Sequence, residues 1–241
     1  MNTTETAYQM QQLKLQGMAA CYRSQLELPL NKQLESHDMV AHLIQAETLN
    51  RSNERTAYYL KLAKLRLPAT PEQITCSAAR NLSKQQLAAL LEGNYIKQGE
   101  PVLITGSTGC GKSYLACALA HQACLLGYRT QYFNMNRFIE KITLARLDGS
   151  YLKQINHLER TALIILDDFG LQTLDQPIKL ALLQIIEDRY ARKSIIITSQ
   201  LPVAKWYDYI NEPTLADAIM DRLMAKAHRI ELKGESMRKK T

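Results

Sequence analysis

A run of eight residues, Gly106 to Ser113, has the types and spacing of a loop that holds phosphate groups. It reads Gly-Ser-Thr-Gly-Cys-Gly-Lys-Ser, which is G-x-x-x-x-G-K-S, and an apolar run over residues 102–105 precedes it. Glycines let the backbone turn so that its N–H groups point at phosphate oxygens, and a helix after the loop adds its positive end. The alternative, an ordinary glycine turn, is disfavoured because a strand precedes the loop and a helix is expected after it.

The side chains of this loop predict a site for ATP and Mg²⁺. The Lys112 ammonium would reach the β- and γ-phosphates and serve catalysis, and the Ser113 hydroxyl would bind Mg²⁺. The residues expected to contact the nucleotide are Gly106, Ser107, Thr108, Gly109, Cys110, Gly111, Lys112, Ser113 and Tyr114.

A second chemical element is the continuous apolar run over residues 162–166, which ends in Asp167 and Asp168. An uninterrupted apolar strand is typical of a parallel sheet buried on both faces, and ligands bind at the carboxyl ends of such strands. Asp167 is therefore expected to hold Mg²⁺, directly or through water, and Asp168 to orient or deprotonate the attacking water. The alternative is a strand that simply ends in an acidic turn.

The elements that must position these residues alternate along the chain. Strands are expected at residues 102–105, 128–133, 163–166, 194–198 and 228–232, and helices at 84–92, 113–126, 178–191 and 213–224. Strands that alternate with helices indicate an α/β fold with a right-handed parallel sheet. Residues 1–67 read as helical, with a break at Pro29 and a helix start at Ser36, so we expect a helical domain over 1–67 and an ATPase domain over 68–241.

Composition narrows the class of protein. The 241 residues are 46% hydrophobic, which allows one full-sized domain and a smaller one. The five cysteines are odd in number and lack C-x-x-C spacing, which argues against a disulfide framework or a zinc site. No apolar run is long enough to span a membrane, and the first residues do not resemble a signal peptide. A reducing cytoplasm fits these features. The net charge of +7 favours a polyanionic partner, although the basic residues of the helical region, Arg66 among them, also fit a solvated face.

Two further segments resemble AAA+ ATPases. Thr198-Ser199-Gln200, at the end of an apolar strand, resembles the sensor 1 segment, which would lie beside the γ-phosphate if that strand sits between those of the loop and of Asp167. Thr198 and Ser199 are then candidate catalytic residues. The segment over residues 215–223 resembles the one that carries the arginine finger, so Arg222 would act on the nucleotide of a neighbouring subunit. The alternative is a surface arginine paired with Asp217 or Asp221.

The whole chain resembles the IstB-like transposition helper ATPases. The resemblance rests on Gln16-Gly17-Met18, the phosphate loop, Asp167-Asp168-Phe169-Gly170, Arg189-Tyr190, Trp206, residues 217–223 and Gly234-Glu235-Ser236-Met237-Arg238. It implies an AAA+ ATPase that forms an ATP-dependent homo-oligomer on double-stranded DNA, remodels it, and delivers it to a DDE transposase. Many members have Asp-Glu at positions 167 and 168, so the shorter Asp168 is a departure. Since nine residues follow Leu232, no helical lid domain is expected.

Residues 137–158 occupy the place where initiator and loader AAA+ proteins carry an extra helix that faces DNA. The basic residues of this segment would bind phosphates without reading bases, and they are Arg137, Lys141, Arg146 and Lys153. A solvated helix face is the alternative. Three other functions stay open at this point: a DnaC-like replicative helicase loader, a small-molecule P-loop kinase, and a nucleotide switch that does not hydrolyse. Adjacency to a transposase gene would separate the first of these from a transposition helper.

Overall fold

The computed structural model describes residues 3–237, and its contacts divide the chain into two compact units. The helical unit is Met1–Tyr58 and the sheet unit is Tyr59–Thr241. The division falls inside a long helix, α3, which runs from Ser36 to Ala63, and the expected boundary at residue 67 lies four residues after that helix. None of the described helices combines the length and the apolar composition that a membrane span requires.

The helical unit holds α1 (Thr3–Gln12), α2 (Gln16–Leu26), the short 3₁₀ turn η1 (Leu30–Lys32) and the first part of α3. The break at Pro29 and the helix start at Ser36 are as predicted. A buried carboxylate joins α2 to α3: Glu47 accepts the backbone N–H groups of Gly17 (2.8 Å) and Met18 (3.2 Å). These first N–H groups of α2 have no partner within their own helix, so Glu47 caps it.

Two further contacts fix Glu47 in this position. The Arg51 guanidinium lies 2.7 Å from its carboxylate and is the main reason why the pKa of Glu47 is below its usual range. A Cβ atom at position 17 would stand 2.5 Å from the Ala46 carbonyl oxygen, so only glycine lets α2 approach α3 this closely.

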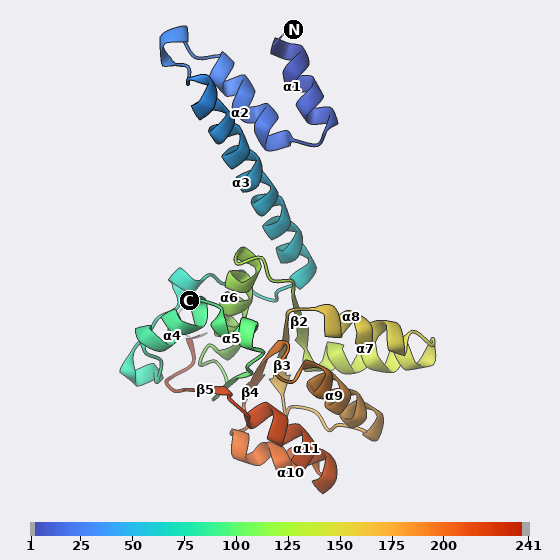
Figure 1. Cartoon of the computed structure of the whole chain (residues 1–241). Coiled ribbons are helices and arrows are strands. Elements are labelled where there is room, and N and C mark those ends of the chain that lie inside the picture. The colour runs from blue at the N-terminus through green and yellow to red at the C-terminus, as the bar shows by residue number, and fades with distance from the viewer. Residues whose placement is uncertain (1–2, 238–241) are drawn as a thin grey trace. The chain divides into compact units, whose positions relative to one another are not determined.

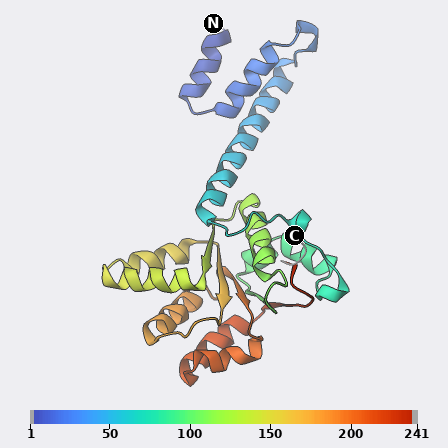
Figure 2. The same ribbon diagram turned by 180° about the vertical axis from the view of Figure 1, so that it is seen from behind.

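The sheet unit is built on five parallel strands in the order β2-β3-β4-β1-β5 (Figures 1 and 2). The strands are β1 (Val102–Gly106), β2 (Thr130–Asn134), β3 (Leu163–Phe169), β4 (Ser194–Ser199) and β5 (His228–Leu232). Because β4 pairs with both β1 and β3, the end of β4 lies between the phosphate loop and the acidic pair. The condition on which the Thr198 assignment depended is therefore met.

Helices cover both faces of this sheet. In β3, Leu163 and Ile165 pack in one core with α4, α5 and α6, whereas Ile164 and Leu166 pack in the other core with α7 to α11. Neighbouring side chains of a strand point to opposite faces, so burial on both sides explains the continuous apolar runs. The covering helices are α4 (Lys84–Leu91), α5 (Asn94–Gln98), α6 (Lys112–Leu125), α7 (Met135–Leu147), α8 (Tyr151–Arg160), α9 (Gln176–Arg189), α10 (Trp206–Ile210) and α11 (Pro213–Met224).

Several element boundaries differ from the sequence prediction, each for a local reason. β2 begins at Thr130, because the Tyr128 N–H bonds to the Ala123 carbonyl and so belongs to the turn that ends α6. α9 begins at Gln176, because Asp175 caps it. Thr70-Pro71-Glu72-Gln73 has Pro at the first helical position, a pattern typical of a helix start, but it forms only η2 (Pro71–Gln73), a single 3₁₀ turn.

A buried arginine ties the amino ends of β3 and β4 together. The Arg189 guanidinium donates to the carbonyl oxygens of Leu158, Thr161, Ala162 and Ser194. Burial lowers the pKa of this side chain. The four carbonyl oxygens satisfy the two terminal nitrogens of this buried cation, whereas its Nε has no hydrogen-bond partner among the described residues. The resemblance had singled out Arg189 without a role, and the geometry makes it a structural clamp at the sheet edge away from the phosphate loop.

Candidate active site

A cavity of about 430 Å³ opens at the carboxyl ends of the strands, between the phosphate loop and the acidic pair. The loop contributes Thr108, Gly109, Gly111, Lys112 and Ser113, and β3 and β4 lead to Asp168 and Gln200. The other residues that line it come from α6, from the segment after α3 and from the chain after β5, and they are Arg66, Leu67, Gln73, Ile74, Arg80, Tyr114 and Met237. Most of the predicted nucleotide-binding residues therefore share one concave site.

The phosphate loop holds its own lysine in place. Lys112 is the first residue of α6, and its Nζ donates to the carbonyl oxygens of Gly106 and Ser107, both at 2.9 Å. Gly111 precedes it with φ +95°, a left-handed conformation that glycine adopts without strain. The ammonium group is thus fixed beside the amino end of α6, where a triphosphate would lie.

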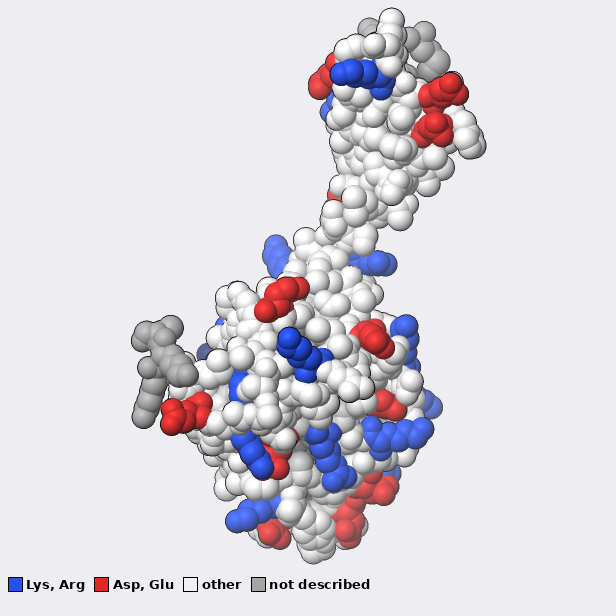
Figure 3. All heavy atoms as spheres, turned by 90° about the vertical axis from the view of Figure 1, so that its left-hand side faces the viewer, with Lys and Arg blue, Asp and Glu red and all other residues white. Residues whose placement is uncertain are grey.

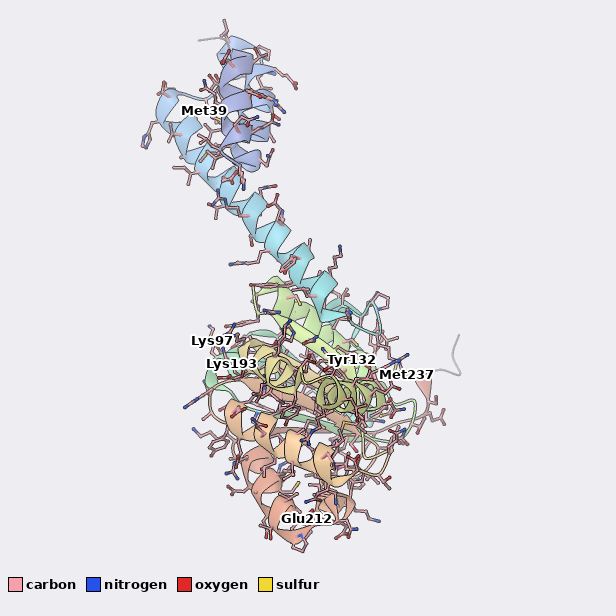
Figure 4. All side chains as sticks on the ribbon, turned by 90° about the vertical axis from the view of Figure 1, so that its right-hand side faces the viewer. Met39, Lys97, Tyr132, Lys193, Glu212 and Met237 are labelled. Carbon is pink, nitrogen blue, oxygen red and sulfur yellow. The ribbon has the colours of Figure 1, made fainter. Side chains whose placement is uncertain are left out.

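Asp167 is fully buried at the end of β3, yet it accepts hydrogen bonds from hydroxyl groups on three neighbouring elements. Ser113 Oγ lies 2.8 Å from its Oδ1, and the hydroxyls of Thr198 and Tyr132 also donate to the carboxylate. Burial is the main reason why the pKa of Tyr132 is raised, and the bond to Asp167 adds to it. In Figure 4, Tyr132 lies within the sheet unit.

The Ser113–Asp167 pair fits a Mg²⁺ ion. A hydroxyl and a carboxylate oxygen in contact are the hard donors that this ion prefers, and Mg²⁺ commonly takes one or two such side chains together with phosphate and water. Within residues 3–237 no group of three or more His, Cys, Asp or Glu side chains is arranged around a metal position. The pair would therefore hold the ion only together with the oxygens of a bound phosphate.

A bulge in β3 explains how two consecutive acids serve one site. In a regular strand Asp167 and Asp168 would point to opposite faces of the sheet. Here the register between β3 and β4 breaks between Leu166 and Phe169, and Asp168 adopts φ +64°. This left-handed conformation costs little for Asp compared with other residues. Asp168 consequently lines the same cavity that Asp167 underlies.

Asp168 is held by three groups. Asn134 Nδ2 donates to its Oδ2 at 2.8 Å, its own N–H donates to Thr198 Oγ1 at 3.1 Å, and Arg66 Nη1 lies 3.3 Å from Oδ2. The same Arg66 nitrogen stands 3.6 Å from Asp167. The Tyr132 hydroxyl first, and then the two carboxylates, raise the pKa of Arg66.

Arg66 belongs to this site and not to a solvated helix face. The sequence feature that could have indicated this is the alternation Leu65-Arg66-Leu67, which is typical of an extended segment with its leucines on one side and Arg66 on the other. In the structure both leucines pack on the core.

The two hydroxyls after β4 have different surroundings. Thr198 bridges Asp167 and Asp168, as described above. The Ser199 hydroxyl is buried, donates to the Phe169 carbonyl oxygen and accepts from the Leu201 N–H (3.0 Å), so it fastens the ends of β3 and β4 and does not line the cavity. Gln200, which we had not chosen, does line it and accepts from Thr108 Oγ1 at 2.7 Å.

Of the other predicted nucleotide contacts, Cys110 is buried and does not line the cavity, whereas Tyr114 lines it. The Cys110 side chain is buried under the loop, and its carbonyl oxygen accepts from Arg80 Nη2 at 3.0 Å. The Tyr114 hydroxyl donates to Gln73 Oε1, which draws η2 to the start of α6.

Arg222 lies at the other end of the sheet from the phosphate loop. It lines a cavity of about 110 Å³ with Pro101 and Lys193, which directly precede β1 and β4. Its Nη2 is 2.8 Å from Glu187 Oε1. The alternative reading, an arginine paired with Asp217 or Asp221, therefore named the wrong carboxylate. In Figure 4, Lys193 and Met237 stand at opposite edges of the sheet unit. Arg222 therefore cannot reach the phosphate loop of its own subunit.

The basic insertion forms the helix pair α7 and α8. A hollow of about 730 Å³ beside these helices is lined by Lys141 and Lys153, together with Arg129 and Arg160, which we had not chosen. Burial, and the nearby charge of Lys64, lower the pKa of Lys141.

The other two predicted DNA contacts lie outside this hollow. Arg137 pairs with Glu140 at 2.9 Å. Arg146 stacks on the Tyr151 ring, 4.6 Å from its centroid. On the face shown in Figure 3, basic and acidic side chains are mixed over the sheet unit.

Comparison with known proteins decides the family. The family model described as IstB-like ATP binding protein matches residues 8–241. The chain belongs to the IstB-like ATP-binding proteins. This IstB-like chain is 42% identical over 230 residues to the putative insertion sequence ATP-binding protein y4uH of Sinorhizobium fredii. The alignment covers 95% of this chain and 93% of the relative. It is 37% identical over 203 residues to the ATP-binding protein of insertion sequence IS1162 from Pseudomonas fluorescens, with 84% and 88% covered.

Solved structures share the fold of this IstB-like protein. The DnaC helicase loader aligns with a TM-score of 0.60 at 20% identity, over 71% of this chain and 100% of that one. The replication initiator DnaA, bound to AMPPCP and single-stranded DNA, gives 0.60 at 20% identity, over 71% and 52%. The AAA+ fold expected from the sequence is therefore confirmed, and at these identities the likeness shows the fold alone.

Replacement of Arg66 tests its place at the two carboxylates. Because its guanidinium contacts the carboxylates that a Mg²⁺ ion would approach, Arg66→Ala is expected to lower the Mg²⁺ concentration needed for half-maximal thermal stabilisation of the ADP complex. Because this ion pair is half-exposed, we expect the required Mg²⁺ concentration to fall by about threefold to fivefold. Arg55→Ala, which removes the same charge from the helical unit, should cause no shift. An unchanged or higher Mg²⁺ requirement for Arg66→Ala would contradict the competition.

Proposed function

We propose that this IstB-like protein is a Mg²⁺-dependent ATPase that assembles on double-stranded DNA, remodels it and regulates a DDE transposase. The observation that carries the ATPase part is the joint placement of Lys112, Ser113, Asp167 and Asp168 around one cavity. Membership in a family of insertion sequence ATP-binding proteins supports the transposition part.

In this proposal each side chain has one task during hydrolysis. The Lys112 ammonium, fixed on two loop carbonyls, stabilises negative charge on the β- and γ-phosphates. The Asp168 carboxylate accepts a proton from the attacking water, and Asn134 and the Thr198 hydroxyl fix its position. Ser113 and Asp167 would hold a Mg²⁺ ion, which would supply positive charge to neutralise the phosphates.

A replicative helicase loader is the second candidate, since the fold is shared with DnaC. The y4uH relative favours the transposition function over the helicase loader. Its name refers to an insertion sequence, and it aligns with this chain over 93% of its own length. Preference for duplex over single-stranded DNA, and a transposase gene beside this one, would separate the two functions.

The nucleotide chemistry is tested by two charge-changing variants. Lys112→Ala should lose nucleotide binding by about 100-fold or more, because the phosphates lose a charge-assisted partner. Asp168→Asn should bind ATP within about twofold of the parent protein, yet its turnover should fall by about 100-fold, since an amide accepts no proton from water.

Fluorescent ADP titration and phosphate release measure these two effects. Lys84→Ala on α4 and Asp208→Asn on α10 are matched controls, exposed and outside the cavity. Hydrolysis at the parent rate by Asp168→Asn would show that another group activates the water.

Duplex binding is tested through its salt dependence. If the hollow beside α7 and α8 contacts phosphates, the affinity for a mixed-sequence duplex falls steeply with salt. The double variant Lys153→Gln/Arg160→Gln should then reduce the slope of log affinity against log salt by about 2, which anisotropy titrations at several salt concentrations measure. Lys84→Gln/Lys97→Gln removes equal charge from α4 and α5 and should leave the slope unchanged. If the two double variants gave the same slope, Lys153 and Arg160 would not contact DNA phosphates and the DNA would bind outside this hollow.

Assembly is tested by mixing two inactive variants. Because Arg222 and the phosphate loop lie at opposite ends of one sheet, Arg222→Ala should bind ATP normally and hydrolyse it about 10³-fold more slowly, in line with other arginine fingers. Mixed with Asp168→Asn, it should regain part of the ATPase rate, since some interfaces then pair an intact Asp168 with an intact Arg222. Hetero-oligomers that form without any recovery would show that Arg222 is not a finger acting between subunits.

A further inference from the structure

The chain after β5 turns back over the phosphate loop. We call residues 233–237 the tail. The Lys233 N–H donates to the Arg80 carbonyl oxygen at 3.1 Å, and the Met237 N–H donates to the Gly109 carbonyl oxygen at 3.0 Å. The tail is thereby hydrogen-bonded at both of its described ends, and its far end lies on the loop itself.

Gly109 shows that the loop is shaped for this contact. The G-x-x-x-x-G-K-S pattern fixes Gly106 and Gly111 but leaves position 109 open. Here a Cβ atom at position 109 would stand 2.2 Å from Ser236 Oγ and 2.7 Å from Ser236 Cβ, and the residue has φ +83°. Both the backbone conformation and the passage of the tail therefore require glycine at this position.

Arg80 contacts both the tail and the phosphate loop. While its carbonyl oxygen accepts from the tail, its guanidinium donates to the carbonyl oxygens of Cys110 (3.0 Å) and Thr75 (2.7 Å). Asn81 Nδ2 also donates to the Glu231 carbonyl oxygen, 2.9 Å away in β5. The loop, β5 and the tail are therefore linked to the segment before α4 through two adjacent residues, Arg80 and Asn81.

The lining of the cavity combines polar and apolar side chains. Asp168, Gln200 and Lys112 supply polar groups, whereas Leu67, Ile74 and Met237 supply apolar surface. Met237 is 47% exposed, so its thioether offers apolar surface at the cavity mouth. In Figure 4, Met237 lies at the edge of the sheet unit.

We propose that the tail forms one wall of the base compartment and that Met237 packs on the purine ring of a bound adenine nucleotide. This inference rests on the proposed nucleotide site and adds to it the residue that contacts the base. A polarisable thioether packs well against an aromatic ring, and Leu67 and Ile74 add apolar surface to the same cavity. The phosphate chain would then point toward Lys112.

Two neutral variants and two probes test the proposal. Met237→Ala should weaken the binding of fluorescent ADP by about tenfold, because the ring loses its apolar partner, whereas Met237→Leu should stay within about twofold of the parent protein. Inorganic triphosphate, which has no base, should displace fluorescent ADP with the same inhibition constant from both variants and the parent. Glu235→Ala, an exposed tail residue outside the cavity lining, is the control, and melting temperatures without ligand check the fold.

The outcomes separate this inference from the proposed function. Unchanged ADP affinity in Met237→Ala, or an equal loss for ADP and inorganic triphosphate, overturns the role of the tail. If Lys112→Ala still loses both probes in the same experiment, the nucleotide site stands and only the tail inference fails. If Lys112→Ala retains both probes, the nucleotide site itself fails.

Discussion

The site depends on one buried carboxylate. Asp167 has no exposed surface, and an ionised group in that position costs several kcal/mol unless hydrogen bonds replace its water. Its three hydroxyl donors come from the first turn of α6, from β2 and from β4, which are separate parts of the chain. The order of the strands and the start of α6 must therefore be correct at the same time before this carboxylate is stabilised. The same network fixes Ser113 and Thr198, so the phosphate loop and the end of β4 are positioned by one group.

The bulge in β3 adds what the network alone does not provide. It brings the second acid into the cavity although the strand would otherwise direct it to the opposite face, and the left-handed backbone at Asp168 favours a short polar side chain. A bulge next to an active site re-aims a side chain in this way in many folds.

The sequence predicted the strands, the phosphate loop and the acidic pair because each has a local signature in residue type and spacing. Arg66 and Met237 were missed because each reaches the cavity from a segment whose local pattern does not indicate a nucleotide site. Gln200 lay in the segment expected beside the γ-phosphate, but Thr198 and Ser199 were chosen from that segment instead. Arg129 was missed because it precedes β2, and only the folded chain brings it beside Lys153. Arg160 follows Lys153 by seven residues on the same helix, α8, and was missed because it lies two residues beyond the segment chosen as DNA-facing. Arg238, one of the residues on which the family resemblance rests, lies outside the described residues.

Trp206 gives the molecule a spectroscopic property of its own. It is the only tryptophan in the chain, it is fully buried, and its indole packs on Phe169 with 4.9 Å between ring centroids. Its Nε1–H donates to the Leu201 carbonyl oxygen (3.0 Å), one residue after Gln200. The indole thus contacts the residues that directly follow Asp168 and Gln200. Its intrinsic emission therefore originates beside the ends of β3 and β4, and an unlabelled protein carries an optical probe next to the cavity.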